Sequence, residues 1–218
     1  MIRTEPVTHR LLGNVNLRCL PDGGSLEFCL RDQGAIGIGA WDDDLFVGSL
    51  WFYKLGDDLT NPYAPPWVGY NTANRESLQE RKARSGLASG PFLGLDCVHV
   101  GRLIENGPDG TPDPRYLGRG IGTRLLEAAI VFAKENGYAA VLHGGGPDRI
   151  QSYNHWAGSL PARVPLRHGF TCTRRTPFLV DGERNIDCPP EIYDEMARSG
   201  VEQDHIVEVV LYLTEDRA

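Results

Sequence analysis

The chain lacks the features that mark several large classes of protein. Its apolar runs fall well short of the roughly 20 residues that a membrane-spanning helix needs. The first residues, Met1 to Pro6, lead into no apolar segment of the kind that a secretory signal contains. No Gly-Lys pair occurs anywhere in the chain, which excludes a Walker A phosphate loop. We therefore expect a cytoplasmic protein that binds no membrane and does not hydrolyse nucleotides through a P-loop.

The cysteines are too scattered to form a disulfide framework or a recognisable zinc motif. Their number is odd, and they stand far apart at Cys19, Cys29, Cys97, Cys172 and Cys188. This pattern fits reduced thiols, so no metal is expected. Positive charge is also in deficit, with a formal net charge of -7. That balance argues against nucleic-acid binding, and we attribute it to solubility ahead of attraction to cationic amines.

The composition that remains is typical of an enzyme-sized domain. With 218 residues, 41% of them hydrophobic, the chain can bury one core of useful size. We expect a single domain over residues 1–218, with insertions at about residues 54–91 and 101–114. The first insertion opens with turn residues and prolines and then carries a charged run of helical composition at residues 75–84. A span of this length suggests one wall of a substrate pocket.

A glycine-rich turn at residues 115–123 is the most informative segment that is present. Gly118, Gly120 and Gly122 let the backbone come close to an anion and take conformations that a Cβ atom would forbid. A helix that starts there presents unpaired N–H groups and the positive end of its dipole. A dinucleotide fingerprint fails in both registers, because Thr123 and Leu125 stand where the third glycine is required. The turn therefore predicts a pyrophosphate site of another kind.

The segments on both sides of the turn have clear patterns. Residues 92–100 form an apolar run typical of a buried strand. Apolar side chains recur at three- and four-residue steps over residues 121–136, which predicts an amphipathic helix that Gly137 ends. Residues 138–143 predict the next strand, so the helix is expected to join two parallel strands by a right-handed crossover.

Weaker patterns place the remaining elements. Residues 35–41 and 45–53 predict a hairpin across the aspartates at 42–44. Further predictions are a short helix at 25–32, a helix or turn at 147–160, a helix at 188–200 and a final strand at 206–213. The first 24 residues show no clear periodicity.

The pattern Arg115-x-x-Gly118-x-Gly120, between a buried strand and an amphipathic helix, resembles the acetyl-CoA loop of the GNAT acetyltransferase superfamily. Asn154 followed by Gly169-Phe170 is similar to a later part of the family pattern. The resemblance covers residues 35–213 and is strongest over residues 92–143. It implies an α+β fold with a mixed, mostly antiparallel central sheet, a splayed parallel strand pair and helices on both faces.

For function, the resemblance implies direct transfer of an acetyl group from acetyl-CoA to a primary amine of a small molecule or protein. The backbone of the splayed strand would hold the pantetheine and the thioester, and the amides of the turn would hold the pyrophosphate. Arg115, Arg119 and Arg124 would add positive charge beside the pyrophosphate. The alternative is that these arginines form a solvated basic face. The expected cofactor-binding residues are Val98, His99, Val100, Arg115, Leu117, Gly118, Arg119, Gly120, Ile121, Gly122, Thr123 and Asn154.

Three side chains are candidates for catalysis. Tyr153 stands where an acid could reach the CoA sulfur, and packing of its ring is an equal alternative. Asp96 and His99 are candidate bases, directly or through a water. A hydrogen-bonded structural role is favoured for Asp96 and stays open for His99. His143 could line the cleft, whereas Cys97 lacks the Cys-His-acid pattern of an acyl-enzyme.

The loop at residues 101–114 departs from the family pattern, because it separates the splayed strand from the turn. It lies beside the cofactor, where it could act as a lid, a dimer contact or a tether. Two functional classes stay open, an N-acetyltransferase and a non-catalytic CoA-binding regulator or scaffold, besides a turn that binds nothing. The acceptor is not identified, and a homodimer is one expectation because exposed late strands often pair in such folds.

Overall fold

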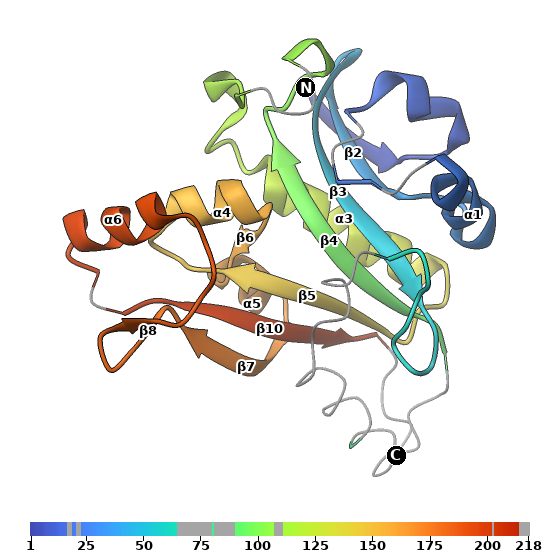
Figure 1. Cartoon of the computed structure of the whole chain (residues 1–218). Helices are drawn as coiled ribbons and strands as arrows, with labels where there is room; N and C mark the ends of the chain where they lie inside the picture. The colour runs from blue at the N-terminus through green and yellow to red at the C-terminus, as the bar shows by residue number, and fades with distance from the viewer. Residues whose placement is uncertain are drawn as a thin grey trace.

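An eight-stranded mixed sheet forms the centre of the molecule (Figure 1). The structure, a computed structural model, describes residues 1–16, 19–20, 23–64, 80, 90–106, 111–201 and 203–213. The strands follow one another across the sheet in the order β1 (Ile2–Pro6), β2 (Gly37–Asp42), β3 (Leu45–Leu55), β4 (Phe92–Val100), β5 (Ala140–Gly146), β10 (His205–Tyr212) and β7 (Thr171–Pro177), while β6 (Leu160–Pro161) pairs with β5.

The sheet is antiparallel except around β5, which runs parallel to β4 and β6. Strands β4 and β5 pair only where residues 92–94 face residues 140–142. Beyond Gly94 the two strands separate, and their arrowheads point apart in Figure 1. The predicted fold class, with a splayed parallel pair in a mostly antiparallel sheet, is therefore confirmed.

Helices cover both faces of the sheet. Helix α3 (Ile121–Glu135) packs on one face with the inward side chains Leu50 and Phe52 of β3. Helix α1 (Gly23–Gln33) packs on the other face with Trp51 and Tyr53. Successive side chains of a strand point to opposite faces, so β3, which is apolar throughout its centre, contributes to both cores.

The later elements form a third, smaller apolar cluster. Helices α4 (Gln151–Ala157) and α6 (Pro190–Arg198) lie side by side at one end of the sheet (Figure 1). The side chain of Phe178, just after β7, is fully buried between them. The remaining elements are α5 (Arg163–Arg167), the hairpin of β8 (Leu179–Val180) and β9 (Glu183–Arg184), and the short 3-10 helices η1 (His9–Asn14), η2 (Ile104–Asn106) and η3 (Pro114–Tyr116).

Most predicted elements are present with small shifts of their ends. The strand at 92–100 is β4, the helix at 121–136 ends one residue earlier, and the strand at 138–143 starts and ends later as β5. Strand β1 and helix η1 were not predicted, because these edge segments carry no apolar periodicity. The charged run at 75–84 lies outside the described residues apart from Glu80. None of the described helices combines the length and the apolar character needed to cross a membrane.

An ion pair ties α5 to α3, and its strength should depend on pH. His168 bonds Val164 O at 2.8 Å through Nδ1 and Glu127 Oε1 at 3.1 Å through Nε2. Both nitrogens can donate only in the imidazolium form, so these bonds raise the pKa of His168 above its ordinary value. Its contribution to stability is therefore fully present below the pKa of the unfolded state and is lost as pH rises through the folded pKa.

We predict that His168→Gln lowers the free energy of unfolding by about 0.2–1 kcal/mol near pH 5.5 and by less near pH 9. The effect is small because Glu127 is mostly exposed. Urea unfolding at both pH values measures the difference. Glu127→Gln should remove the same pH dependence, and an equal loss of stability at both pH values would contradict the linkage.

Candidate functional site

Two glycines of the 115–123 turn have the left-handed backbone that the sequence predicted. Gly118 and Gly120 have φ angles of 71° and 72°, and Gly120 is the N-cap of α3. A Cβ atom at either position would meet nothing within 4 Å. Glycine is therefore needed for the backbone conformation, which leaves the first amides of α3 facing outward without a capping side chain.

Gly122 leaves room for a neighbouring side chain. It lies within the first turn of α3, and a Cβ atom there would stand 2.7 Å from Leu160 Cδ2. The absence of a side chain lets the segment of residues 158–161 approach the start of the helix. Gly122 and Leu160 therefore both line the space beside the turn.

A cavity of about 340 Å³, the turn cavity, opens beside these glycines. Most of the predicted cofactor-binding residues line it, and they come from β4, from the turn and from α4. They are Val98, His99, Val100, Leu117, Gly118, Gly120, Ile121, Gly122, Thr123 and Asn154. The structure thus brings the strand and the turn of the predicted site to one opening.

The arginines of the turn do not line this cavity. Arg115 pairs with Asp113 at 2.6 Å, and hydrogen bonds from its guanidinium and its backbone N–H lower the pKa of that carboxyl. The guanidinium groups of Arg115 and Arg119 each lie 5.8 Å from the centre of the Tyr116 ring. Arg124 turns the other way and donates to Ile2 O at 3.4 Å. The predicted cofactor-binding roles of Arg115 and Arg119 stay predictions, as does the alternative of a solvated basic face.

Other polar side chains, which the sequence did not single out, line the turn cavity. Arg102, two residues after β4, lines the turn cavity, as do Gln151 and His155. The last two stand four residues apart on α4, so they share one face of that helix. Their spacing and the position of Arg102 beside the predicted strand were visible in the sequence, but no pattern connected them to the turn.

The gap between β4 and β5 is crossed by the chain itself. Gly158 accepts a hydrogen bond from the Val98 N–H at 2.7 Å, and β6 pairs Leu160 and Pro161 with the end of β5. The N–H of Ala162 donates to Gly146 O at 2.8 Å. Backbone groups that the splayed strands do not exchange are thus satisfied by the 158–161 segment, which lies where pantetheine was expected.

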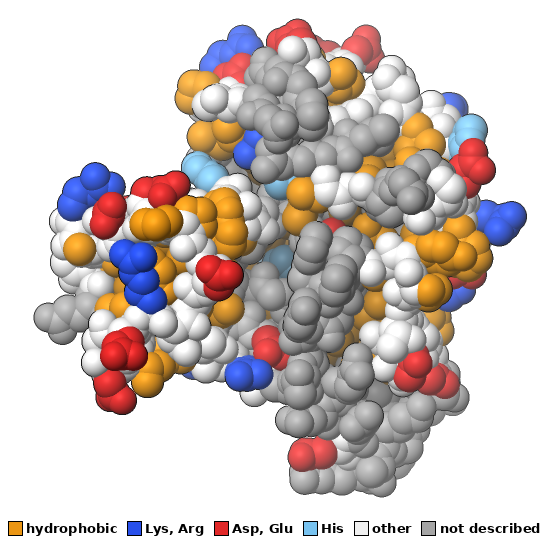
Figure 2. All heavy atoms as spheres, in the orientation of Figure 1, with side chains coloured by type: hydrophobic (Ala, Val, Ile, Leu, Met, Phe, Trp, Pro, Cys, Tyr) orange, Lys and Arg blue, Asp and Glu red, His pale blue; other side chains and the backbone are white. Residues whose placement is uncertain are grey.

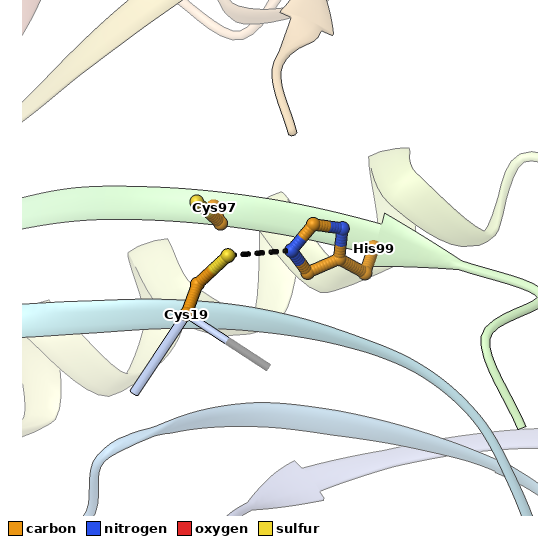
Figure 3. A group of neighbouring side chains, drawn as sticks. All are labelled: Cys19, Cys97 and His99. Atoms are coloured by element: carbon orange, nitrogen blue, oxygen red, sulfur yellow. Dashed lines mark hydrogen bonds between the residues drawn. The ribbon is translucent and has the colours of Figure 1, made fainter. Parts of the chain in front are cut away.

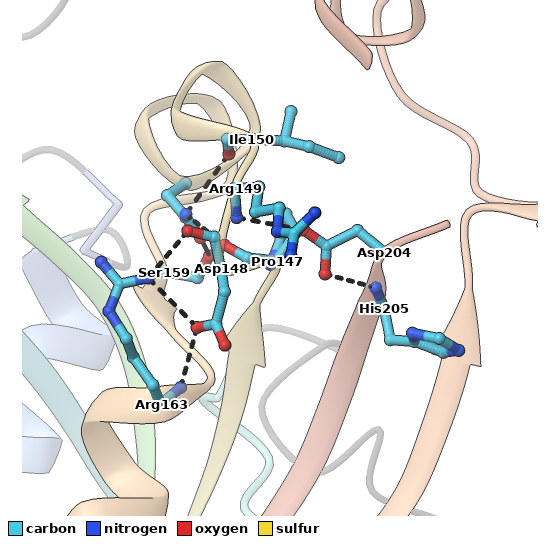
Figure 4. A network of polar contacts seen from close by, with 9 residues as sticks. Pro147, Asp148, Arg149, Ile150, Ser159, Arg163, Asp204 and His205 are labelled. Carbon is cyan, nitrogen blue, oxygen red and sulfur yellow. Dashed lines mark hydrogen bonds and ion pairs between the residues drawn. The ribbon is translucent and has the colours of Figure 1, made fainter. Parts of the chain in front are cut away.

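Polar contacts hold this segment in place (Figure 4). Asp148 accepts from the Arg163 backbone N–H at 2.9 Å, and Arg163 Nη1 donates to Asp148 O at 2.7 Å. On the neighbouring side Asp204 accepts from the Arg149 N–H at 3.0 Å. The first two bonds therefore join the ends of the excursion from β5 to α5 to each other, and the third fixes one end to the segment before β10.

Asn154 is part of this bracing. Its Nδ2 donates to Pro147 O at 2.8 Å, and its Oδ1 accepts from Ser159 Oγ at 3.0 Å. A Cβ atom at Gly146 would collide with the same amide oxygen. The side-chain amide of Asn154 thus has partners within the protein. Its predicted contact with pantetheine stays a prediction.

A second cavity, of about 570 Å³, lies on the other side of the 158–161 segment. Its walls include Asp96, His143 and Tyr153, together with Glu208 of β10. Figure 2 shows a hollow beside α4 at which histidine atoms are visible. Ser159 lines both cavities, so one short stretch of backbone separates them.

The second cavity contains two of the three predicted catalytic residues. Burial raises the pKa of Tyr153 to about 12, so its phenol keeps its proton at neutral pH. The same ring packs edge-on against Phe178 with 5.0 Å between centres, so the packing role is present as well. Asp96 lines this cavity, whereas His99 lines the turn cavity.

His143 is the most isolated polar side chain of the second cavity. It is 2% exposed, and neither ring nitrogen has a hydrogen-bond partner in the described part of the chain. Burial lowers its pKa to about 4, so the ring is neutral at pH 7 and resists protonation. The thiol of Cys97 has a raised pKa because of a hydrogen bond with Cys19 and burial, which makes it a poor nucleophile.

Comparison with known families settles the class of the protein. A family model described as the Acetyltransferase (GNAT) family matches residues 16–154. The chain belongs to the GNAT acetyltransferase family. The match spans the sheet from the loop before α1 to α4, and thus includes the glycine turn, the splayed strands and Asn154.

Solved structures with the same GNAT fold are distant in sequence. A crystal structure of arylalkylamine N-acetyltransferase 2 from Aedes aegypti is 13% identical with a TM-score of 0.51, over 98% of this chain and 99% of that chain. An agmatine N-acetyltransferase mutant in its apo form is 15% identical with a TM-score of 0.50, over 98% and 100%. The comparison with curated proteins finds no match.

The left-handed glycines of the GNAT turn allow a matched test. We predict that Gly120→Ala weakens CoA binding about tenfold, because the left-handed conformation costs an alanine about 1–2 kcal/mol and the amides turn away. Gly137→Ala is the control, since Gly137 has a φ angle of 71°, equally open surroundings and a place at the other end of α3. Calorimetry measures CoA binding, and an equal effect of both variants would show that only stability had changed.

Proposed function

We propose that this protein is an N-acetyltransferase that moves an acetyl group from acetyl-CoA to a primary amine in a ternary complex. The observation that carries the proposal is that the turn cavity and the second cavity lie on either side of the 158–161 segment. One opening offers helix amides to an anion, and the other offers the acidic side chains Asp96 and Glu208 to an amine. Membership of the GNAT acetyltransferase family supports the same reaction.

In this proposal the CoA pyrophosphate binds the amides of residues 118–123 at the N-terminus of α3. Arg102, which lines the turn cavity, supplies positive charge to the pyrophosphate, whereas Arg115 is paired with Asp113. The pantetheine arm then follows β4 toward His99. The N–H of Val98 can serve the thioester oxygen only if the turn at Gly158 releases it, so binding requires the 158–161 segment to shift.

The chemical step needs a neutral amine and an acid for the departing thiolate. The amine nitrogen attacks the thioester carbonyl, the C–N bond forms, and the C–S bond breaks as the tetrahedral intermediate collapses. A proton leaves the nitrogen for His99 or Asp96, directly or through a water, and Tyr153 gives its proton to the sulfur. The products are an amide and CoA with a free thiol.

The second cavity suggests a cationic or polar amine as the acceptor. Carboxylates at Asp96 and Glu208 favour an ammonium group in the approach, while Tyr153 and Trp156 supply aromatic walls. Agmatine and arylalkylamines, the amines for which the structural neighbours are named, are therefore the first acceptors to test.

A purified sample with acetyl-CoA and an amine panel tests the proposal. We expect calorimetric binding of CoA and amine-dependent release of free thiol, with kcat reduced at least tenfold in Tyr153→Phe. Tyr193→Phe is a control, because Tyr193 belongs to the same apolar cluster and lies outside both cavities. Binding of CoA without turnover on any amine would instead favour a non-catalytic CoA-binding regulator, a role consistent with the occupied Val98 N–H.

A second pair of variants separates the cavity arginine from those of the turn. We predict that Arg102→Ala weakens CoA binding about tenfold or more, because a hydrogen bond to a charged group contributes about 1.5–3 kcal/mol. Arg119→Ala should weaken it less than threefold, since Arg119 lies against Tyr116 outside the cavity. Calorimetry at one ionic strength compares them, and the reverse ranking would argue for a clamp made by the turn.

A further inference from the structure

Three soft ligand atoms meet beside β4 although they come from distant parts of the chain (Figure 3). Cys97 and His99 are two residues apart on one strand, so their side chains point to the same face. Cys19 reaches them from the loop before α1, and its Sγ lies 3.3 Å from His99 Nε2. The two sulfurs and the nitrogen all lie within 4.8 Å of one another.

We propose that Cys19, Cys97 and His99 form a binding site for Zn²⁺ or a similar thiophilic divalent cation. A tetrahedral zinc ion holds thiolate sulfur at about 2.3 Å and imidazole nitrogen at about 2.0–2.1 Å, which puts the ligand atoms about 3.5–3.8 Å apart. The separation of Cys19 and His99 is already close to that value. Two cysteines and a histidine are also the donor set that this class of ion prefers.

The surroundings hold two of the ligands ready. Cys97 and His99 are 8% and 6% exposed, and a Cβ atom at Gly158 would stand 3.1 Å from each of them. Backbone pairing of Ser49 with His99 fixes the strand that carries both. Little reorganisation is therefore needed at β4, and Cys19 supplies the adjustable ligand.

Cys19 has an unusual backbone for a side chain of its type. Its φ angle is 65°, in the left-handed region that residues other than glycine seldom adopt. This conformation carries the thiol inward toward β4, where its Sγ contacts His99 Nε2. Strained backbone of this kind is found mainly at functional positions.

The ion would stand between the two cavities. Cys19 and Cys97 line the second cavity, and His99 lines the turn cavity. Binding forms two sulfur–metal bonds and one nitrogen–metal bond, and each thiol gives its proton to the buffer. Three protein ligands leave a fourth position open, and a carboxylate oxygen, Asp96 Oδ1, lies 3.5 Å from Cys97 Sγ.

Cobalt tests this site without reference to activity. The reduced full chain, stripped by a chelator and titrated with Co²⁺, is expected to bind one ion and develop sulfur-to-cobalt charge-transfer absorption with the intense visible bands of tetrahedral coordination. Zn²⁺ should displace the cobalt. Cys19→Ser should weaken binding at least tenfold, whereas Cys172→Ser, on β7 and outside both cavities, should leave it unchanged.

Two results would overturn the site. One is a folded, reduced chain without the charge-transfer absorption, and the other is equal affinity in Cys19→Ser and the unmodified chain. Circular dichroism establishes that each variant is folded. Because Cys97 is buried, His99→Gln is the second variant, and it should lose affinity while both sulfurs remain.

An inhibitory effect of the ion rests on the proposed acetyltransferase function. A bound ion occupies His99 Nε2, so Zn²⁺ should abolish acetylation over the range in which it binds. Mass spectrometry of the acetylated amine is the readout, because free CoA thiol itself binds zinc. Relative to its own uninhibited rate, Cys19→Ser should need at least tenfold more Zn²⁺.

The two proposals fail in different ways. Cobalt binding without acetylation of any amine leaves the metal site standing and counts against the enzyme. Acetylation that continues unchanged with zinc bound overturns the inhibitory role.

Discussion

The hydrogen bonds that β4 and β5 do not make to each other determine the arrangement of this protein. The strands pair over residues 92–94 and 140–142 and then separate, which leaves backbone groups that need partners. Gly158 and β6 supply some of them, and the helix that joins the two strands places its N-terminus at the same opening. Uncapped helix amides and a divided cleft thus meet at one break in the pairing.

The central unit could be predicted from the sequence because its signals are local. The local sequence predicts the conformation of β4 from its apolar run, of α3 from its 3.6-residue pattern, and of the turn from the glycines at 118 and 120. The side chains that line the turn cavity depend on tertiary placement instead. Nothing in the sequence shows that Arg115 is held by Asp113 while Arg102 faces the cavity.

The cysteines show the same limit at longer range. Their spacing argued against a metal, since Cys19 and His99 stand 80 residues apart. The fold brings them together because Cys19 lies against the later part of β4, and no periodic pattern encodes that contact. Likewise, the sequence predicts a helix or turn over residues 147–160. It does not show that the 158–161 segment lies between the strands, which follows from the pairing of β6 with β5.

The third apolar cluster gives one side of the cleft its own support. Ile150 and Tyr153 pack with Phe178, Ile192 and Met196, so α4 and α6 share a small core apart from the two that flank the sheet. Units with separate cores can open at a lower free energy than the whole domain unfolds. Local opening of α4 and α6 would therefore widen the second cavity while the strands behind it keep their own cores.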